Sequence, residues 1–279
     1  MGHCVVDAAE KVLDRKYKVL DKGFVRMVDY MGGDERIVAA ARVSYGSGTK
    51  SWRKDAGLID YLLRNDHTSP FEQVIFTFHT KMPIFVARQW VRHRTARLNE
   101  ISGRYSVMKP EFYVPREKDI SLQSSSNKQG RSDEAANNAV ARKVLSLLSH
   151  DNTTAYGHYQ SMLDDNVARE LARINLPLSL YTEWYWQIDL HNLFHFLRLR
   201  LDAHAQKEIR DYARVLDKLA RTVCPMAFDA FDNHILNGCR FSGKEITILS
   251  QLLKGNTVPP GERDRRILAE KLGFDPFER

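Results

Sequence analysis

The chain has 279 residues, of which 43% are hydrophobic and 28% are charged, as in an ordinary globular protein. It contains no run of about 18 apolar residues, so we expect neither a membrane-spanning helix nor a membrane partner. The net charge of +7 favours an anionic ligand or nucleic acid. Three scattered cysteines (Cys4, Cys224 and Cys239) and an N-terminus interrupted by acidic residues indicate a cytoplasmic protein without disulfides or a signal peptide.

The hydrophobic pattern of the first hundred residues predicts short strands and helices in alternation. Pro83 can open a helix because proline is tolerated at the first helical position, and we expect that helix to run to about Arg94. The other elements expected in this part are strands at 16–20, 23–31 and 72–81 and helices at 34–44 and 54–65.

The second half reads as mainly helical around one aromatic strand, after a loop-rich stretch at 109–131. The elements expected there are a strand at 178–188 and helices at 132–164, 167–174, 189–203, 205–222, 224–237, 244–254 and 262–272. We therefore predict an α+β fold, with a mainly antiparallel sheet flanked by helices. We expect a single domain at 17–240, between an N-terminal extension at 1–16 and a C-terminal helical extension at 241–279.

Arginine is concentrated in the segment 88–104, where five arginines face a single acid, Glu100. Like charges at this density repel one another unless solvent or an anion neutralises them. The guanidinium group is well suited to forked recognition of phosphate or carboxylate. A binding surface for an anion is therefore one interpretation, and a solvated helix face is the other.

Two further segments carry polar residues at informative spacings. Pro70 biases Ser69 away from helix, so His67, Ser69 and Glu72 are expected on an exposed turn, either as turn and capping residues or as ligand contacts. Arg169 and Arg173 stand four residues apart on one helix face, which suits either a surface pair or a joint anion contact.

The segment 189–206 places cations beside apolar residues. Helical spacing puts Arg200 and His204 on the same face as apolar residues such as Phe196. A guanidinium on an apolar stripe costs several kcal/mol unless a negative charge meets it, so we expect either a protein carboxylate or a bound anion there. His191 and His195 have a spacing that also suits a metal, but no third ligand is evident and we expect none.

The order of residues in 92–104 resembles the motif of the flavin-dependent thymidylate synthases. That motif reads Arg-His-Arg, two residues, Ser, one residue, Asn-Glu, one residue, Ser, one residue, Arg. This sequence departs from it at Arg97, where the family has its first serine, and matches it at Arg92, His93, Arg94, Asn99, Glu100, Ser102 and Arg104. The likeness extends over about 18–240.

The resemblance implies reductive methylation of dUMP to dTMP. Methylenetetrahydrofolate would be the carbon donor and NADPH the reductant of an FAD cofactor. The resemblance also implies a homotetramer with active sites at subunit interfaces. Arg200 would stabilise the uracil anion formed on loss of the N3 proton, so that no cysteine nucleophile is required.

The resemblance further implies roles for individual residues. The expected catalytic residues are Arg200, Arg173 and His67. The expected flavin-binding residues are Ser44, Ser69, Glu72, Arg92, His93, Arg94, Thr95, Asn99, Glu100, Asp189, Leu190, His191, His195, Leu199 and His204. The expected dUMP-binding residues are Gln89, Trp90, Val91, Arg92, Glu100, Ile101, Ser102, Gly103, Arg104, Arg173 and Arg200.

Two other classes of function stay open at this point. A nucleic-acid-binding module would explain the basic segment and predicts binding that weakens steeply with salt, although the sequence shows neither a zinc finger nor an RNP signature. A flavin oxidoreductase with another substrate would differ by oxidising NADPH without dependence on dUMP.

Overall fold

The computed structural model describes residues 4–43, 52–125, 130–255 and 259–278. The chain divides into two units, Met1–Phe228 and Asp229–Arg279. Within the described residues, no helix combines the length and the apolar character that crossing a membrane requires. The domain limits expected from the sequence, at 16/17 and 240/241, stay predictions.

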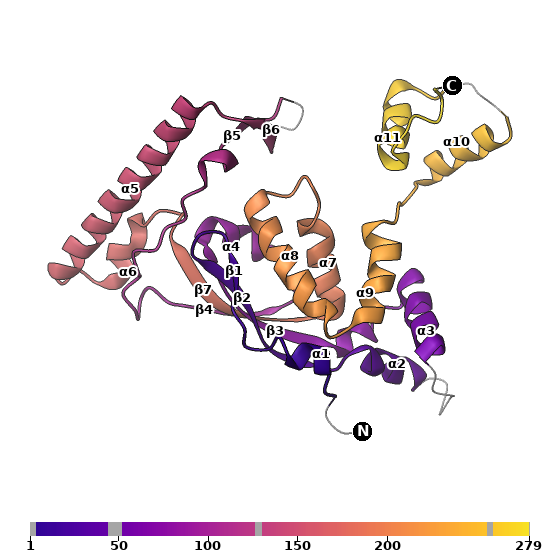
Figure 1. Ribbon diagram of the computed structural model, residues 1–279, viewed down its shortest axis with the longest axis horizontal. Coiled ribbons are helices and arrows are strands. Elements are labelled where there is room, and N and C mark those ends of the chain that lie inside the picture. Colours follow the sequence, from indigo (N-terminus) through magenta and orange to yellow (C-terminus); the bar gives the residue numbers. More distant parts are fainter. Residues whose placement is uncertain (1–3, 44–51, 126–129, 256–258, 279) are drawn as a thin grey trace. The chain divides into compact units, whose positions relative to one another are not determined.

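The centre of the first unit is a five-stranded sheet (Figure 1). Its strand order is β1-β2-β3-β7-β4, and every neighbouring pair is antiparallel. The strands are β1 (Tyr17–Val19), β2 (Gly23–Met31), β3 (Ile75–Pro83), β7 (Tyr181–Asp189) and β4 (Arg97–Glu100). The expected α+β fold with an antiparallel sheet and flanking helices is confirmed.

Helices in the first unit flank the sheet or lie in the connections between its strands. They are α1 (Asp7–Glu10), α2 (Asp34–Arg42), α3 (Trp52–Arg64), η1 (Phe71–Gln73), α4 (Ile84–Trp90), η2 (Glu117–Asp119), α5 (Asn138–Asp164), α6 (Arg169–Ala172), η3 (Arg173–Asn175), α7 (Leu190–Arg200) and α8 (Lys207–Arg221). The helix α9 (Pro225–Phe231) crosses the limit between the two units.

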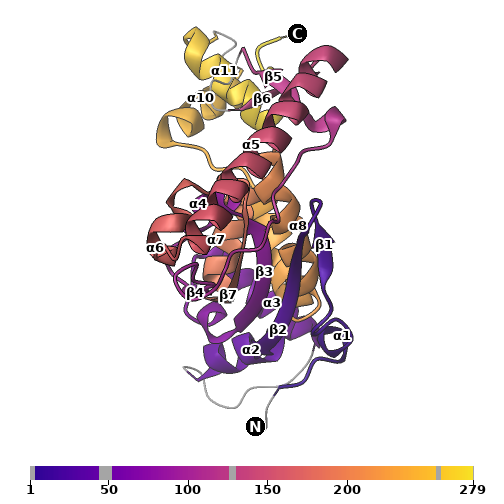
Figure 2. The ribbon, with the colours of Figure 1, turned by 90° about the vertical axis from the view of Figure 1, so that its left-hand side faces the viewer.

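Aromatic residues at every second position of the central strands build the core. Trp184 and Trp186 point from β7 to one face of the sheet, because successive side chains of a strand alternate. That face is covered by α4, α7 and α8, and Figure 2 shows α8 behind the strands. Trp90 of α4 has no exposed surface, and its ring lies 5.1–5.9 Å from those of Trp184, Trp186, Phe196 and Tyr212.

The arginine-rich segment differs from the expected helix at 83–94. The helix α4 ends at Trp90, and Arg97–Glu100 form the edge strand β4 instead of a loop. Backbone pairing explains the difference, because Arg97 lies opposite Gln187 and Glu100 opposite Trp184 of β7. A long-range pairing of this kind cannot be read from local spacing.

Two other boundaries also differ. The long helix α5 begins at Asn138 rather than at 132, because Arg131–Ala135 pair as β6 with β5 (Ser121–Gln123) in a hairpin. The helix α7 ends at Arg200 rather than at 203, because Asp202 Oδ1 accepts from His204 N at 2.8 Å and closes a turn. His204 therefore does not lie on the face of α7 that carries Arg200.

The second unit is a short helical assembly. It contains a π-helical turn, η4 (Asp232–Leu236), and the helices α10 (Gly243–Leu253) and α11 (Glu262–Leu272). Ser242 and Glu245 form a capping box that starts α10. Lys271 of α11 donates to both Glu245 oxygens at 2.7 Å, which ties the two helices together.

Candidate active site

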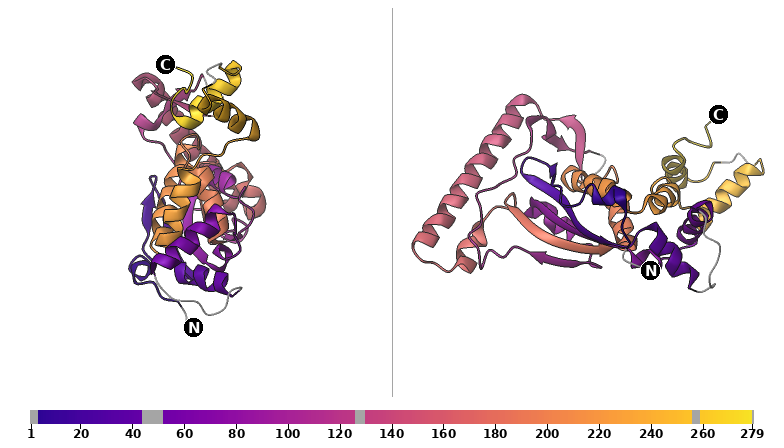
Figure 3. Two further views of the ribbon diagram at one scale, coloured as in Figure 1. Left: turned by 90° about the vertical axis from the view of Figure 1, so that its right-hand side faces the viewer. Right: turned by 60° about the horizontal axis from the view of Figure 1, so that its bottom comes forward.

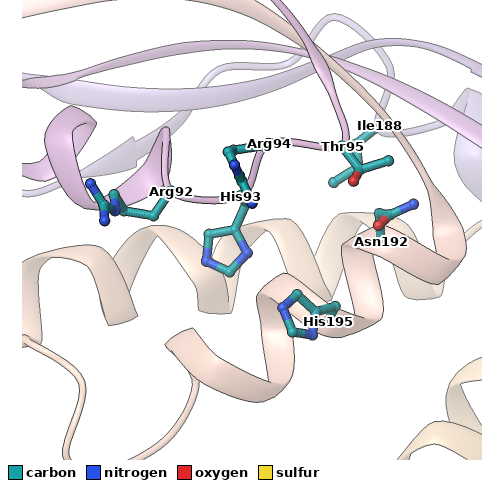
Figure 4. A pocket seen from close by; sticks show the side chains of 7 residues that line it. All are labelled: Arg92, His93, Arg94, Thr95, Ile188, Asn192 and His195. Atoms are coloured by element: carbon teal, nitrogen blue, oxygen red, sulfur yellow. The ribbon is translucent and has the colours of Figure 1, made fainter.

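A pocket lies between the segment that follows α4 and the start of α7 (Figure 4). The sheet contributes Ile188 from the end of β7, and α7 contributes Asn192 and His195. The remaining lining residues are Arg92, His93, Arg94 and Thr95. The structure thus brings four successive residues of the arginine-rich segment to His195, which stands about a hundred positions later in the chain.

His93 is the most strongly perturbed group of the pocket. Its ring packs edge-on against Phe196 at 4.8 Å and against His195 at 5.7 Å. Burial lowers the pKa of His93 to about 4, and the charge of Arg200 acts in the same direction. His93 is therefore neutral at pH 7, and its Nε2 accepts a hydrogen bond from Arg200 Nε at 3.0 Å. This contact assigns the ring proton to Nδ1.

Arg200 is the last residue of α7 and is half-buried. Its Nη2 donates to the main-chain oxygen of Gln89 at 3.3 Å, and its Nε donates to His93. Burial lowers the pKa of the Arg200 guanidinium. Among the described residues, no carboxylate forms an ion pair with Arg200. A half-buried cation that is bound only by neutral acceptors is a favourable place for an anion.

The residues that precede Arg92 in the chain anchor the segment that lines the pocket. The side chain of Gln89 donates to the side-chain oxygen of Gln206, at the start of α8. Trp90 is wholly buried in the core, so its side chain supports the segment from within. The half-buried Val91 closes the last turn of α4 with a hydrogen bond to Ala87 at 3.0 Å.

A second basic cluster forms where the segment 101–105 meets α6 and η3. Ile101 N donates to Glu183 O at 2.9 Å, which extends the pairing of β4 with β7. Arg104 Nε lies 3.3 Å from Glu170 Oε2. A Cβ at Gly103 would lie 3.1 Å from Arg173 Cδ, so the backbone passes close to the Arg173 side chain here. Arg173 therefore lies beside Gly103, the residue that precedes Arg104.

Glu100 and Ser102 connect this cluster to the sheet and to the turn. Thr182 Oγ1 donates to Glu100 Oε1 at 2.5 Å, and Arg104 N donates to Ser102 Oγ at 3.3 Å. Among the described residues, no arginine pairs with Glu100. Asn99 is exposed on β4 opposite Tyr185.

A third group of expected residues lies on the exposed turn before β3. His67, Ser69 and Glu72 are all exposed, and the His67 ring packs edge-on against Tyr61 at 5.8 Å. Leu190 N donates to Val74 O at 2.8 Å, so this turn is next to the start of α7.

The remaining expected residues are placed as follows. Asp189 caps α7 by accepting from Asn192 N at 2.9 Å. Leu190 is buried, His191 is half-buried, and Leu199 is 41% exposed. The exposed His204 pairs with Asp202. Ser44 lies outside the described residues.

Sequence reasoning missed three residues around the pocket. Asn192 lies three positions from both Asp189 and His195, so helical spacing could have found it. Ile188 and Gln206 depend on how β7 and α8 pack, for which the sequence carries no direct signal.

Comparisons with known proteins agree on one family. Residues 26–226 match the family described as thymidylate synthase complementing protein. The flavin-dependent thymidylate synthase of Treponema denticola is 65% identical over 93% of this chain and 98% of its own length. That of Treponema pallidum is 56% identical over 98% of this chain and 89% of its own length.

A solved structure shares the fold. It is the UMP/dUMP methylase PolB from Streptomyces cacaoi bound with 5-Br UMP, which is 32% identical with a TM-score of 0.71. The match covers 78% of this chain and 97% of the methylase.

Proposed function

The chain belongs to the thymidylate synthase complementing protein family, and we propose that it methylates dUMP to dTMP with a flavin. Methylenetetrahydrofolate is the carbon donor, and NADPH is the reductant of FAD. Family membership favours this reaction over the other two classes of function that the sequence left open. The observation in this chain that supports it most strongly is Arg200, a half-buried cation without a carboxylate partner among the described residues.

The donor set of the pocket fits FAD chemically. Arginine side chains and the amide of Asn192 can meet an anionic cofactor, and Ile188 offers an apolar contact to a planar ring. When bound, FAD supplies the hydride for the transferred carbon. We propose that Arg92, His93, Arg94, Thr95 and His195 hold it, with Ser69, Glu72 and Leu190 at the border of the same site.

Arg200 has the central role in the proposed chemistry. Carbon 5 of uracil is a poor nucleophile until negative charge develops on the ring. The guanidinium is held in advance by His93 and by the main chain of Gln89, so it can stabilise this charge without reorganising. Because Cys224 is completely buried and burial raises its thiol pKa well above the usual range, it is a poor nucleophile.

The second basic cluster suits the phosphate of dUMP. We propose that Arg104 and Arg173 bind it, with Ser102 as a hydrogen-bond partner. Arg173 packs beside Gly103, the residue before Arg104, which supports a joint role. Glu100, held by Thr182, would orient the substrate hydroxyls.

The proposal extends to the oligomeric state, the domain limits and the cellular location of the protein. We propose a homotetramer in which the pocket of one subunit is completed by the second basic cluster of another, because Arg92 and Arg94 at the pocket and Arg104 in the cluster are exposed. The catalytic domain would span 17–240, between extensions at 1–16 and 241–279. A cytoplasmic location is supported by Cys4, Cys224 and Cys239, all of which are free thiols.

A visible absorption spectrum combined with product analysis tests the proposal. The purified protein is expected to be yellow, to bleach with NADPH, and to form dTMP only when dUMP and methylenetetrahydrofolate are both present. A colourless preparation that gains no flavin absorbance with added FAD would contradict the proposal. NADPH oxidation that does not depend on dUMP would indicate a flavin oxidoreductase of another specificity.

A further inference from the structure

The long helix α5 buries one face, on which Ala141, Asn152 and Tyr159 lie. Its C-terminal half contributes Tyr156, Tyr159, Met162 and Leu163 to a hydrophobic cluster around Phe112. Within α5, which the structure describes over its whole length, no residue before Tyr156 belongs to that cluster. Figure 3 shows the helix along one side of the first unit. In the N-terminal half Ala141 is buried, whereas other apolar residues lie outside the buried face.

This N-terminal half presents an apolar stripe to solvent. Val140, Val144 and Leu147 stand at positions i, i+4 and i+7, so they share one helix face. Val140 is 40% exposed and Leu147 is 51% exposed. Val144 and the adjoining Leu148 are half-buried. A stripe of this kind is normally covered by another element.

Two opposite charges flank the stripe symmetrically. Lys143 stands four residues before Leu147, and Asp151 stands four residues after it. Both are exposed, and neither forms an ion pair with any described residue. Their neighbour Arg142 is engaged elsewhere, with Glu117 at 3.8 Å.

We propose that α5 packs antiparallel against α5 of a second copy, about a two-fold axis at Leu147. In a two-fold interface each contact occurs twice, with the roles of the two subunits exchanged. Lys143 then faces Asp151 of the partner subunit on both sides of the axis, while Leu147 meets its own copy. The inference rests on the proposed homotetramer, for which it names one interface.

The charge pattern favours an antiparallel second copy of α5 over a parallel copy or an unrelated protein as the partner of the apolar stripe. A parallel pair would place Lys143 against Lys143 and Asp151 against Asp151, which is unfavourable. An unrelated protein would give no reason for opposite charges at equal distances from Leu147. The surface is complementary to itself, as a two-fold interface requires.

Thiol cross-linking tests the position of the axis. In a background with Cys4→Ser and Cys239→Ser, Leu147→Cys should be joined by a short bismaleimide into dimers on a denaturing gel. Ser149→Cys is the matched control, because it lies only about 3 Å further along the helix but about 200° around it. Ser149 is exposed, so its thiol would be equally accessible to the reagent.

Charge exchange tests the pairing across the axis. Lys143→Glu and Asp151→Lys should each weaken self-association about tenfold, because each creates two like-charge contacts per interface. The double variant restores both pairs in reverse and should associate within about twofold of the original protein. Sedimentation equilibrium measures all three.

The outcomes separate this inference from the rest of the proposal. A monomeric unmodified protein would overturn both the α5 interface and the proposed assembly. A tetramer in which Leu147→Cys does not cross-link, or in which the charge exchange has no effect, would overturn the α5 interface alone. A tetramer that cross-links at 147 and not at 149, with rescue by the double variant, supports it.

Discussion

The two halves of the arginine-rich segment differ in how much of their environment the chain itself provides. Residues 92–95 stand on a helix end that is anchored by the buried Trp90, and His93 is held by Arg200. Arg97–Glu100 form the edge strand β4, in which all four residues are exposed, and the chain then turns at 103–105. Arg104 has one exposed carboxylate partner, Glu170. The chain thus preorganises the first half and leaves the second half open to a substrate or another subunit.

The largest expected effect on activity is at Arg200, which binds His93 of the preorganised half. Arg200→Ala should lower kcat by about 10²–10³-fold while flavin binding persists, because one preorganised charge is removed from the reacting ring. Arg198→Ala is the matched control, since Arg198 is exposed on the same helix. Steady-state kinetics with a flavin spectrum measure both effects, and a near-normal kcat for Arg200→Ala would remove the proposed role.

A smaller effect is expected at Arg104, in the open half. Arg104→Ala should raise KM for dUMP by about 10–100-fold, with less change in kcat, because a charge-assisted contact to the phosphate is lost. Arg116→Ala serves as a control, because Arg116 pairs with Asp119 away from both clusters. An unchanged KM would show that the phosphate does not bind at this cluster.

The neutral state of His93 gives a pH prediction. Its pKa is lowered to about 4 in the folded protein, whereas an unfolded chain binds the proton near pH 6.5. The unfolded state therefore holds more protons between these values. The contribution of His93 to the free energy of unfolding is complete above pH 6.5 and is lost as the pH falls toward 4.

Histidine NMR titration measures this pKa directly. His93 should remain neutral at pH 5.5, and Arg200→Met should move its titration to higher pH because one nearby positive charge is removed. If His93 of the unmodified protein titrates near 6.5, the preorganised contact with Arg200 does not form as described.

The smallest effect on activity is expected at Arg97, where the sequence departs from the family motif. Its side chain is exposed on the edge strand, and Arg97→Ser restores the family residue. We expect kcat/KM for dUMP to change by no more than about twofold, since solvent screens an exposed charge. A tenfold change in the same kinetic assay would show that Arg97 contacts a ligand.

The same two halves show what the sequence could and could not predict. Alternation in β7 and helical spacing in α7 are local patterns, so the aromatic strand and the helix that carries Arg200 were predicted with small shifts in their ends. The edge strand β4 was missed because its stability comes from pairing with β7, far away in the chain.

In the candidate site too, local patterns could be read from the sequence and long-range contacts could not. The family resemblance pointed to His93 and Arg200, but only the fold shows that they share a hydrogen bond across about a hundred residues. Asn192 could have been found from its helical spacing to Asp189 and His195, whereas Ile188 is recognised only as a wall of the pocket. His204 was placed on the face of Arg200 by helical arithmetic, which failed because α7 ends earlier.

Mixing two inactive variants tests most directly whether one subunit's pocket is completed by another's basic cluster. Arg200→Ala carries an intact second cluster, and the Arg104→Ala/Arg173→Ala double variant carries an intact pocket. After dissociation and reassembly at low dUMP concentration, about a quarter of the sites should combine an intact pocket with an intact cluster from another subunit. The account predicts recovered dTMP formation in proportion to those sites. Hybrid tetramers that stay as inactive as the separate variants would contradict it.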